Sequence, residues 1–181
     1  MVYDIAHDPD APSKWVERWA PLIPGTGMLL DLACGGGRHV RYFAGLGFDV
    51  TAVDRDASAL AALAYLPRVR TLRADLEGGN PWPFPGILFD GVVVTRYLHR
   101  PLFPHLRNAL APGGVLIYET FATGNERYGR PSNPEFLLWP GELLQEFDGL
   151  EVLGFEEGLT EGARPAVMQR ICVRQAPRKA G

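Results

Sequence analysis

The sequence predicts a single doubly wound α/β domain built around a mostly parallel β-sheet. Short apolar runs alternate with helical patterns from residue 28 to residue 121, which is typical of helices packed on both faces of a sheet. The apolar runs are continuous, as in strands that are buried on both sides. The 181 residues fit one domain, and a hydrophobic fraction of 46% is enough for a packed core.

The first two thirds of the chain contain five expected strands and three expected helices. Ala57–Leu66 is rich in Ala and Leu and stops before Pro67, as helices do. A helix over Leu102–Leu110 ends in the turn Ala111–Gly114, and Gly78–Gly86 is a loop rich in Gly and Pro. The third helix is Arg38–Leu46, and the strands are Met28–Ala33, Phe48–Asp54, Val69–Leu72, Phe89–Val94 and Val115–Phe121.

The last third begins with a long irregular segment, residues 122–140, which is a candidate lid because long loops in compact domains often cover active sites. A short helix over Gly141–Phe147 follows. Two further strands are expected at Leu150–Gly154 and Ala166–Val173, joined by Phe155–Pro165, which is long for a hairpin connection.

The N-terminal segment, residues 1–27, is expected to be helical. It places Trp15 and Trp19 four residues apart, on one face of a helix. The two rings either pack against the body of the domain or form a lid over a ligand. Packing is favoured, because aromatic residues at helical spacing usually belong to a core.

Composition and charge narrow the function classes. The net charge is -3 and no run of like charges occurs, which disfavours a nucleic-acid partner. Cys34 and Cys172 are far apart, so no disulfide framework is expected. The first ten residues lack the pattern of a secretory signal, and no apolar stretch approaches the ~20 residues that span a bilayer. We therefore expect a cytoplasmic protein without a membrane partner, and the oligomeric state stays open.

The most informative segment is Leu29–Val40, in which a strand runs into Cys34-Gly-Gly-Gly and then into a helix. Glycines at such a turn let the backbone approach a ligand closely. The dinucleotide pattern G-x-G-x-x-G fails because its third glycine would fall on Val40, which disfavours a nicotinamide oxidoreductase. The Gly-Lys-Ser/Thr of a phosphate-binding P-loop is also absent.

Acidic residues end three successive expected strands. Asp31 suits a ligand with a cationic head, such as the ammonium and sulfonium of S-adenosylmethionine. Asp54 lies 17 residues after Gly37, where a carboxylate accepts hydrogen bonds from ribose hydroxyls. Asp75 is expected near the adenine amine, with the backbone N–H of Leu76 donating to the ring.

These residues together resemble the class I S-adenosylmethionine-dependent methyltransferases, over roughly Met28 to Val173. The family's acidic-x-Gly-x-Gly-x-Gly motif is read here as Asp31-x-Ala33-x-Gly35-x-Gly37, with Ala33 at the first glycine. The Phe89-Asp90 opening of the fourth strand and the turn Pro112-Gly113-Gly114 also match. The resemblance implies a Rossmann-like, seven-stranded sheet with an antiparallel last strand. Phe136–Phe147, with the strand after it, looks like the tellurite-resistance and thiopurine-type branch.

The expected site has three groups of residues and no metal. The cofactor, S-adenosyl-L-methionine, is expected to contact Asp31, Ala33, Gly35, Gly37, Asp54, Arg55, Asp75, Leu76 and Thr95. Cys34 is expected to be a small side chain behind the cofactor, because no histidine partner is evident near it. His39 is expected to face solvent or to cap the loop.

Candidates for proton transfer and acceptor binding come after the fourth and fifth strands, since ligands bind beyond the carboxyl ends of strands in such sheets. His99 is a candidate base, or else caps the next helix. Tyr97 is a candidate wall or hydrogen-bond donor, and Glu119 a candidate base or arginine partner. The acceptor is expected to meet Arg96, Arg127, Tyr128 and Arg130, and Arg100 is expected to approach the same cavity.

The function favoured by the sequence is methyl transfer from S-adenosylmethionine to a small, polar or anionic acceptor by direct in-line displacement. In such a reaction the protein contributes mainly alignment and a dry cavity. Two alternatives remain at this point: a methyltransferase that acts on RNA or protein, and a non-catalytic S-adenosylmethionine-binding protein.

Overall fold

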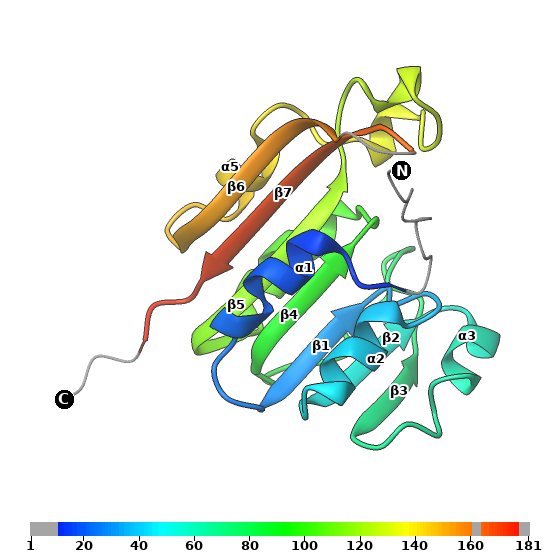
Figure 1. Cartoon of the computed structure of the whole chain (residues 1–181), viewed down its shortest axis with the longest axis vertical. Helices are drawn as coiled ribbons and strands as arrows, with labels where there is room; N and C mark the ends of the chain where they lie inside the picture. The colour runs from blue at the N-terminus through cyan, green and yellow to red at the C-terminus, as the bar shows by residue number, and fades with distance from the viewer. Residues whose placement is uncertain (1–10, 161–163, 178–181) are drawn as a thin grey trace, which may run out of the picture.

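The computed structural model describes residues 11–160 and 164–177. Its seven strands form one sheet in the order β3-β2-β1-β4-β5-β7-β6 (Figure 1). The pairs β1–β2, β1–β4, β2–β3 and β4–β5 are parallel, whereas β7 is antiparallel to both of its neighbours. The doubly wound fold and its antiparallel last strand, predicted from the sequence, are confirmed.

The strands have the following bounds: β1 (Met28–Leu32), β2 (Asp49–Asp54), β3 (Val69–Arg73), β4 (Phe89–Thr95), β5 (Leu110–Phe121), β6 (Glu151–Thr160) and β7 (Ala166–Arg174). The carboxyl ends of β1 to β5 meet at one side of the sheet because these strands are parallel. The end of β6 and the start of β7 lie at the same side. We call this side the carboxyl edge.

Helices cover both faces of the sheet. The α-helices are α1 (Lys14–Trp19), α2 (Arg38–Gly45), α3 (Ala57–Ala61), α4 (Phe103–Asn108) and α5 (Glu142–Glu146). Four 3-10 helices accompany them: η1 (Ala20–Leu22), η2 (Arg100–Leu102), η3 (Asn125–Arg127) and η4 (Pro134–Phe136). Buried side chains of α1, α2 and α3 form one apolar core and those of α4 and α5 form the other. We call the two sides the α1 face and the α4 face; Figure 1 shows α1 and α2 lying across the former.

The N-terminal helix packs on the sheet, as the sequence favoured. Trp15 is 4% exposed, and the Trp15 and Trp19 rings meet edge to face with centroids 5.4 Å apart. Trp19 lies so close to Gly154 of β6 that a Cβ there would come within 2.2 Å of the ring. Of the predicted N-terminal segment, residues 1–10 lie outside the described residues.

Three predicted boundaries are wrong by five residues or more. α3 ends at Ala61, five residues before the predicted end. Leu110 belongs to β5 and pairs with Phe89, with a register shift that absorbs the predicted turn over residues 111–114. Gly114 permits this shift, because a Cβ would come within 2.8 Å of two backbone oxygens. β6 continues to Thr160, so the long predicted connection is largely strand. As an exposed edge strand, β6 carries charged residues that hide its strand pattern.

Candidate functional site

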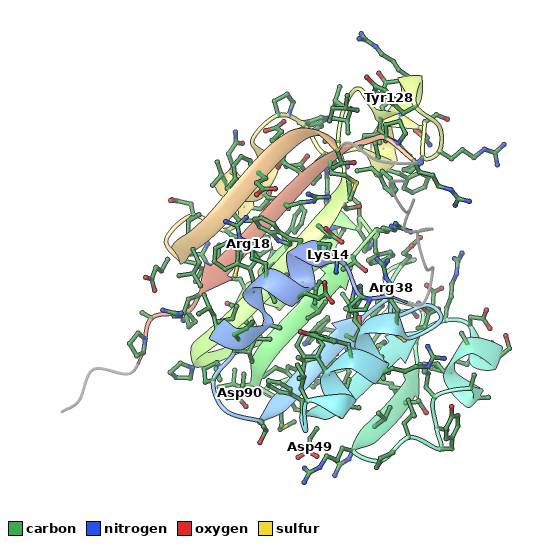
Figure 2. All side chains as sticks on the ribbon, viewed as in Figure 1. Lys14, Arg18, Arg38, Asp49, Asp90 and Tyr128 are labelled. Carbon is green, nitrogen blue, oxygen red and sulfur yellow. The ribbon has the colours of Figure 1, made fainter. Side chains whose placement is uncertain are left out.

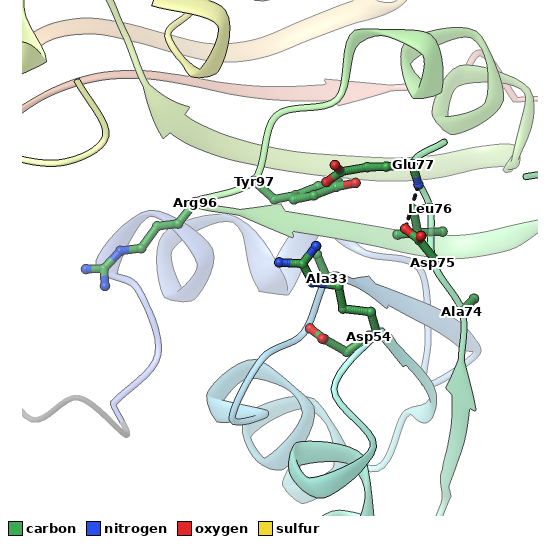
Figure 3. A pocket seen from close by; sticks show the side chains of 9 residues that line it. Ala33, Asp54, Ala74, Asp75, Leu76, Glu77, Arg96 and Tyr97 are labelled. Atoms are coloured by element: carbon green, nitrogen blue, oxygen red, sulfur yellow. Dashed lines mark hydrogen bonds between the residues drawn. The ribbon is translucent and has the colours of Figure 1, made fainter. Parts of the chain in front are cut away.

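A cavity of about 270 Å³ opens at the carboxyl edge, between the ends of β1, β2, β3 and β4 (Figure 3). Its position is where doubly wound sheets bind ligands. The lining residues are Ala33, Asp54, Arg55, Ala74, Asp75, Leu76, Glu77, Arg96 and Tyr97. Seven of the nine were predicted to contact cofactor or acceptor or to serve as catalytic candidates, and we call this hollow the first cavity.

The glycine loop between β1 and α2 has the backbone that a close approach requires. Ala33, Gly35 and Gly37 have φ angles of 54°, 52° and 76°, in the left-handed region that favours glycine. A Cβ on Gly35 would meet open space, whereas one on Gly37 would come within 2.4 Å of Leu63. Gly35 therefore leaves room for a ligand, and Gly37 is required by packing.

Asp54 fastens this loop to the end of β2. One carboxylate oxygen accepts a hydrogen bond from the Gly35 N–H at 2.8 Å, and the other accepts from the Asp56 N–H at 2.9 Å. A carboxylate oxygen has further lone pairs, so Asp54 retains accepting capacity toward the cavity.

Asp31 is almost completely buried, at 1% exposure, beneath the loop. Burial raises the pKa of this carboxyl to about 7, an effect that the positive charge of Arg38 opposes. Among the described residues, one of its oxygens has no hydrogen-bond partner. An orphaned buried acceptor is costly, and a donor or cation placed there would lower that cost.

The end of β3 contributes two acids rather than the one predicted. Asp75 accepts a hydrogen bond from the Glu77 N–H at 3.0 Å, which folds Glu77 back over the first cavity. There the Glu77 carboxylate meets the Tyr97 hydroxyl (Figure 3). Burial, and then the Glu77 charge, raise the pKa of Tyr97 above its usual range, so the hydroxyl stays protonated beside this carboxylate. The backbone carbonyl of Tyr97 is held in turn by the buried Tyr118 hydroxyl at 2.7 Å.

His39 contradicts the prediction that it faces solvent or caps the loop. It is 2% exposed, and its Nε2 accepts a hydrogen bond from the Ser13 N–H at 3.1 Å. Burial lowers its pKa to about 3, so the ring is neutral. Because Nε2 accepts, the proton lies on Nδ1, which faces the Thr95 hydroxyl at 3.4 Å. His39 thus links α1 to the end of β4.

A row of polar side chains crosses the α1 face at the carboxyl edge, and we call it the polar row. It consists of Thr95, Glu119, Arg170 and Glu156, which are direct register neighbours on β4, β5, β7 and β6. Glu119 is 4% exposed, and its carboxylate lies 3.3 Å from the Arg170 guanidinium. An arginine partner was one of the two roles predicted for Glu119. The sequence did not identify Arg170 as that partner, because Arg170 lies inside a strand with an apolar pattern.

The predicted convergence of four arginines on one cavity is wrong for Arg100. Its guanidinium makes hydrogen bonds of 2.7 and 3.0 Å to the Glu142 carboxylate, and it also donates to the carbonyls of Glu135 and Leu137. It stacks over Trp139, 4.8 Å from the ring centroid. Arg100 therefore fastens the second half of the 122–140 loop to η2, instead of facing a ligand.

The first half of that loop is fastened to β7. Asn125, 1% exposed, accepts from the Val167 N–H at 3.1 Å and donates to the Pro131 carbonyl at 3.0 Å. Arg127, Tyr128 and Arg130 between these anchors are exposed, and Figure 2 places Tyr128 at the far end of the loop. The loop stays at the carboxyl edge, but none of its residues lines the first cavity.

Cys34 and Arg38, on either side of the glycines of the loop, both have shifted pKa values. Burial raises the pKa of the Cys34 thiol, and the nearby Asp31 and Asp54 charges add to the effect, so Cys34 stays a neutral, small side chain. Arg38, which the sequence analysis did not single out, lies half-buried at the start of α2 near the segment that enters α1 (Figure 2). Burial, and then the charge of Arg96, lower its pKa. The position of Arg38 directly after the glycine loop is the sequence feature that could have marked it as a candidate site residue.

His99 lies at the start of η2 and is partly exposed, outside the lining of the first cavity.

Across residues 11–160 and 164–177, no group of three His, Cys, Asp or Glu side chains is arranged to hold a metal ion. In the same residues, no helix has both the length and the apolar character needed to cross a membrane.

Known proteins give three kinds of similarity. Residues 29–114 match a family model described as a methyltransferase domain. Over 118 residues, the chain is 35% identical to uncharacterized methyltransferases of Mycobacterium bovis and Mycobacterium tuberculosis, a match that includes 60% of this chain and 58% of theirs. The chain thus spans little more than half the length of these relatives.

Solved structures share the fold. TehB from Haemophilus influenzae matches with a TM-score of 0.72 and 22% identity over 89% of this chain and 61% of TehB. The glycopeptide N-methyltransferase MtfA, solved with S-adenosylmethionine, matches with a TM-score of 0.64 and 22% identity over 96% of both chains.

Proposed function

We propose that this chain, of which residues 29–114 match a methyltransferase-domain family model, binds S-adenosylmethionine and transfers its methyl group to a small, polar or anionic acceptor. The observation that carries the proposal is the first cavity, which is lined by Ala33 of the glycine loop and by Asp54 and Asp75 at the ends of β2 and β3, with Asp31 buried beneath the loop. Each of these acids matches one part of the cofactor.

The residues present fit this cofactor. The orphaned oxygen of Asp31 is a complement for an ammonium group. The open space over Gly35 and Gly36 admits a ligand against the backbone. The Asp54 carboxylate is placed for ribose hydroxyls. In full, the residues proposed to hold the cofactor are Asp31, Ala33, Gly35, Gly37, Asp54, Arg55, Asp75, Leu76 and Thr95.

When bound, S-adenosylmethionine supplies a methyl group on a positively charged sulfur that is a good leaving group. The chain's own contribution is then to hold the acceptor's nucleophilic atom in line with that methyl group and to keep water out. For an acceptor that must lose a proton, Glu119 and His99 are the proposed bases. Glu119 lies at the end of β5 beside Thr95, with its charge balanced by Arg170.

We propose that the acceptor meets Tyr97 and Arg96 on the side of β4, and Arg127, Tyr128 and Arg130 on the side of the loop. Arg96 has a φ of 55°, a strained conformation for a bulky residue that directs its side chain away from Asp54 (Figure 3). Arginines suit oxygen-rich groups, because the guanidinium fork donates to two oxygens at once.

Calorimetric titration with S-adenosylhomocysteine and with NADH tests the cofactor. We expect binding of S-adenosylhomocysteine and none of NADH. Asp54→Ala should weaken that binding by about 1–3 kcal/mol, through loss of charge-assisted hydrogen bonds. Asp49→Ala is the matched control, since Asp49 lies at the opposite end of the same strand, where its carboxylate pairs with the exposed Arg68. Equal affinities in the two variants would contradict the placement.

Turnover is tested by a screen of small acceptors for production of S-adenosylhomocysteine. A chain that binds the cofactor but methylates no small carboxylate, amine, thiol or hydroxyl compound would contradict the proposed acceptor class.

A further inference from the structure

A second cavity, of about 290 Å³, lies at the carboxyl edge on the outer part of the sheet. It is formed by the end of β6 and the start of β7, where the 122–140 loop is fastened through Asn125 and Val167. Its lining is mixed: Glu156, Glu157, Gly158, Leu159, Thr160, Met168 and Arg170. None of these residues lines the first cavity.

Arg170 is the unusual member of this lining. Its Nε lies 3.3 Å from Glu119 and its Nη1 lies 3.5 Å from Glu156, but neither contact has the alignment of a hydrogen bond. The Nε–H is buried without a partner among the described residues. A guanidinium has five N–H donors, so beyond the buried Nε–H, which faces Glu119, Arg170 has four donors on its two Nη atoms that a ligand could use.

Several charged side chains surround Arg170 on the α1 face. Glu156 also pairs with Arg18 of α1 at 3.0 Å. Glu157 belongs to the opposite face, because side chains alternate along a strand and its carboxylate accepts from the Gly141 N–H at 3.0 Å. On the α1 face, Arg18 and Arg170 therefore lie against the carboxylates of Glu119 and Glu156, and the charge of Arg38 acts on both Glu119 and Asp31.

The second cavity lies on the acceptor side of the first. Arg96, which lines the first cavity, donates its backbone N–H to the Glu119 carbonyl at 2.9 Å, and Glu119 is the register neighbour of Arg170. Adjacent strands are about 4.8 Å apart. Arg170 is thus two strands, or about 10 Å, from the end of β4, within the reach of one small molecule.

We propose that the second cavity binds the acceptor, and that Arg170 holds a carboxylate or similar oxyanion of it while Met168, on the same face of the sheet, contacts its apolar body. The inference rests on the proposed function and specifies its substrate class. The guanidinium fork donates to two oxygens of the acceptor, and the carboxylates of Glu119 and Glu156 keep that fork in place.

The test uses the full chain saturated with S-adenosylhomocysteine, titrated with benzoate and with benzamide as the uncharged isostere, and followed by protein NMR. The wild type should bind benzoate at least tenfold more tightly than benzamide. Arg170→Gln should lose this preference, and Arg170→Lys should keep only part of it. Arg174→Gln is the matched control, because Arg174 lies at the far end of the same strand and, within the described part of the chain, pairs with Glu151.

Removing Arg170 leaves Glu119 buried without its counter-ion, which can unfold the chain. The double variant Glu119→Gln with Arg170→Gln removes both charges, and it should fold, bind S-adenosylhomocysteine and fail to select benzoate. Undiminished selection in either Arg170→Gln variant overturns the proposal, as does a wild type that binds both probes equally. Failure of the proposed function is separate, since it appears as absent S-adenosylhomocysteine binding in the wild type.

Discussion

The two halves of the sheet build their parts of the site by different means. We call β3, β2 and β1 the inner half and β5, β7 and β6 the outer half. Around β1, β2 and β3 the site is made of loop backbone, with left-handed residues at Ala33, Gly35 and Gly37 and an aspartate that fastens them. Around β5, β7 and β6 it is made of side chains on the strands themselves, such as Glu119 and Arg170. The inner half is local in sequence, whereas the outer half depends on antiparallel pairing between distant segments.

The largest effect should come from the backbone of the inner half. Gly37→Ala would press a Cβ against Leu63 at 2.4 Å, at a φ of 76°. We expect a loss of about 3–4 kcal/mol in the free energy of unfolding, measured in urea. Gly36→Ala, whose Cβ would meet open space, should change it by less than about 1 kcal/mol. Similar losses in both variants would contradict the distinction between Gly37, which is required by packing, and Gly36, which faces open space.

The buried charge of the inner half should make stability depend on pH. Burial raises the pKa of Asp31 to about 7 in the folded chain, from the ordinary aspartate value of 3.8 that holds in the unfolded chain. The folded state therefore binds more protons between about pH 4 and pH 7, so the contribution of Asp31 lowers stability as pH rises through that window. Asp31→Asn should abolish this slope and raise the free energy of unfolding at pH 8 by about 2–3 kcal/mol.

The same Asp31→Asn variant should bind S-adenosylhomocysteine more weakly at pH 8, because the amide lacks the charge that an ammonium group needs. Denaturation and calorimetry on one preparation measure both effects. A variant that loses stability at pH 8 would show that the Asp31 charge is compensated within the folded chain.

An intermediate effect is expected where the two halves meet, at the contact between Glu77 and Tyr97. Glu77→Ala and Tyr97→Phe should each weaken S-adenosylhomocysteine binding, and the double variant should be no weaker than the worse single one. The coupling free energy should be about 1 kcal/mol. Tyr65→Phe, at a site 77% exposed, serves as the control. Strictly additive losses would mean that Glu77 does not position the Tyr97 ring.

The smallest effect on cofactor binding should come from the loop of the outer half. Arg127→Ala combined with Arg130→Ala removes two exposed side chains, so the affinity for S-adenosylhomocysteine should change by less than about 0.5 kcal/mol. Turnover of an acceptor found by the screen should be severely reduced. Normal turnover would remove these two residues from the acceptor site.

Much of the inner half could be predicted from the sequence because its parts are short-range. A glycine-rich turn between a strand and a helix has few structural uses, and the order of strands places Asp54 beside it. Glu77 was missed although Asp75 was found, because only the fold shows that the chain turns back after Asp75 and brings Glu77 to Tyr97.

By itself, the sequence determined the alternation of strands and helices, the glycine loop and the acids at successive strand ends, since apolar periodicity and backbone freedom are local properties. Only the tertiary structure decided the polar row, the burial of His39 and the use of Arg100 as a fastener for the loop. Those outcomes depend on which distant residues become neighbours when β7 pairs with β5 and when α1 closes over the sheet. Glu142, which pairs with Arg100, and Ser13, which donates to His39, lie tens of residues away in the sequence and become neighbours only in the folded chain.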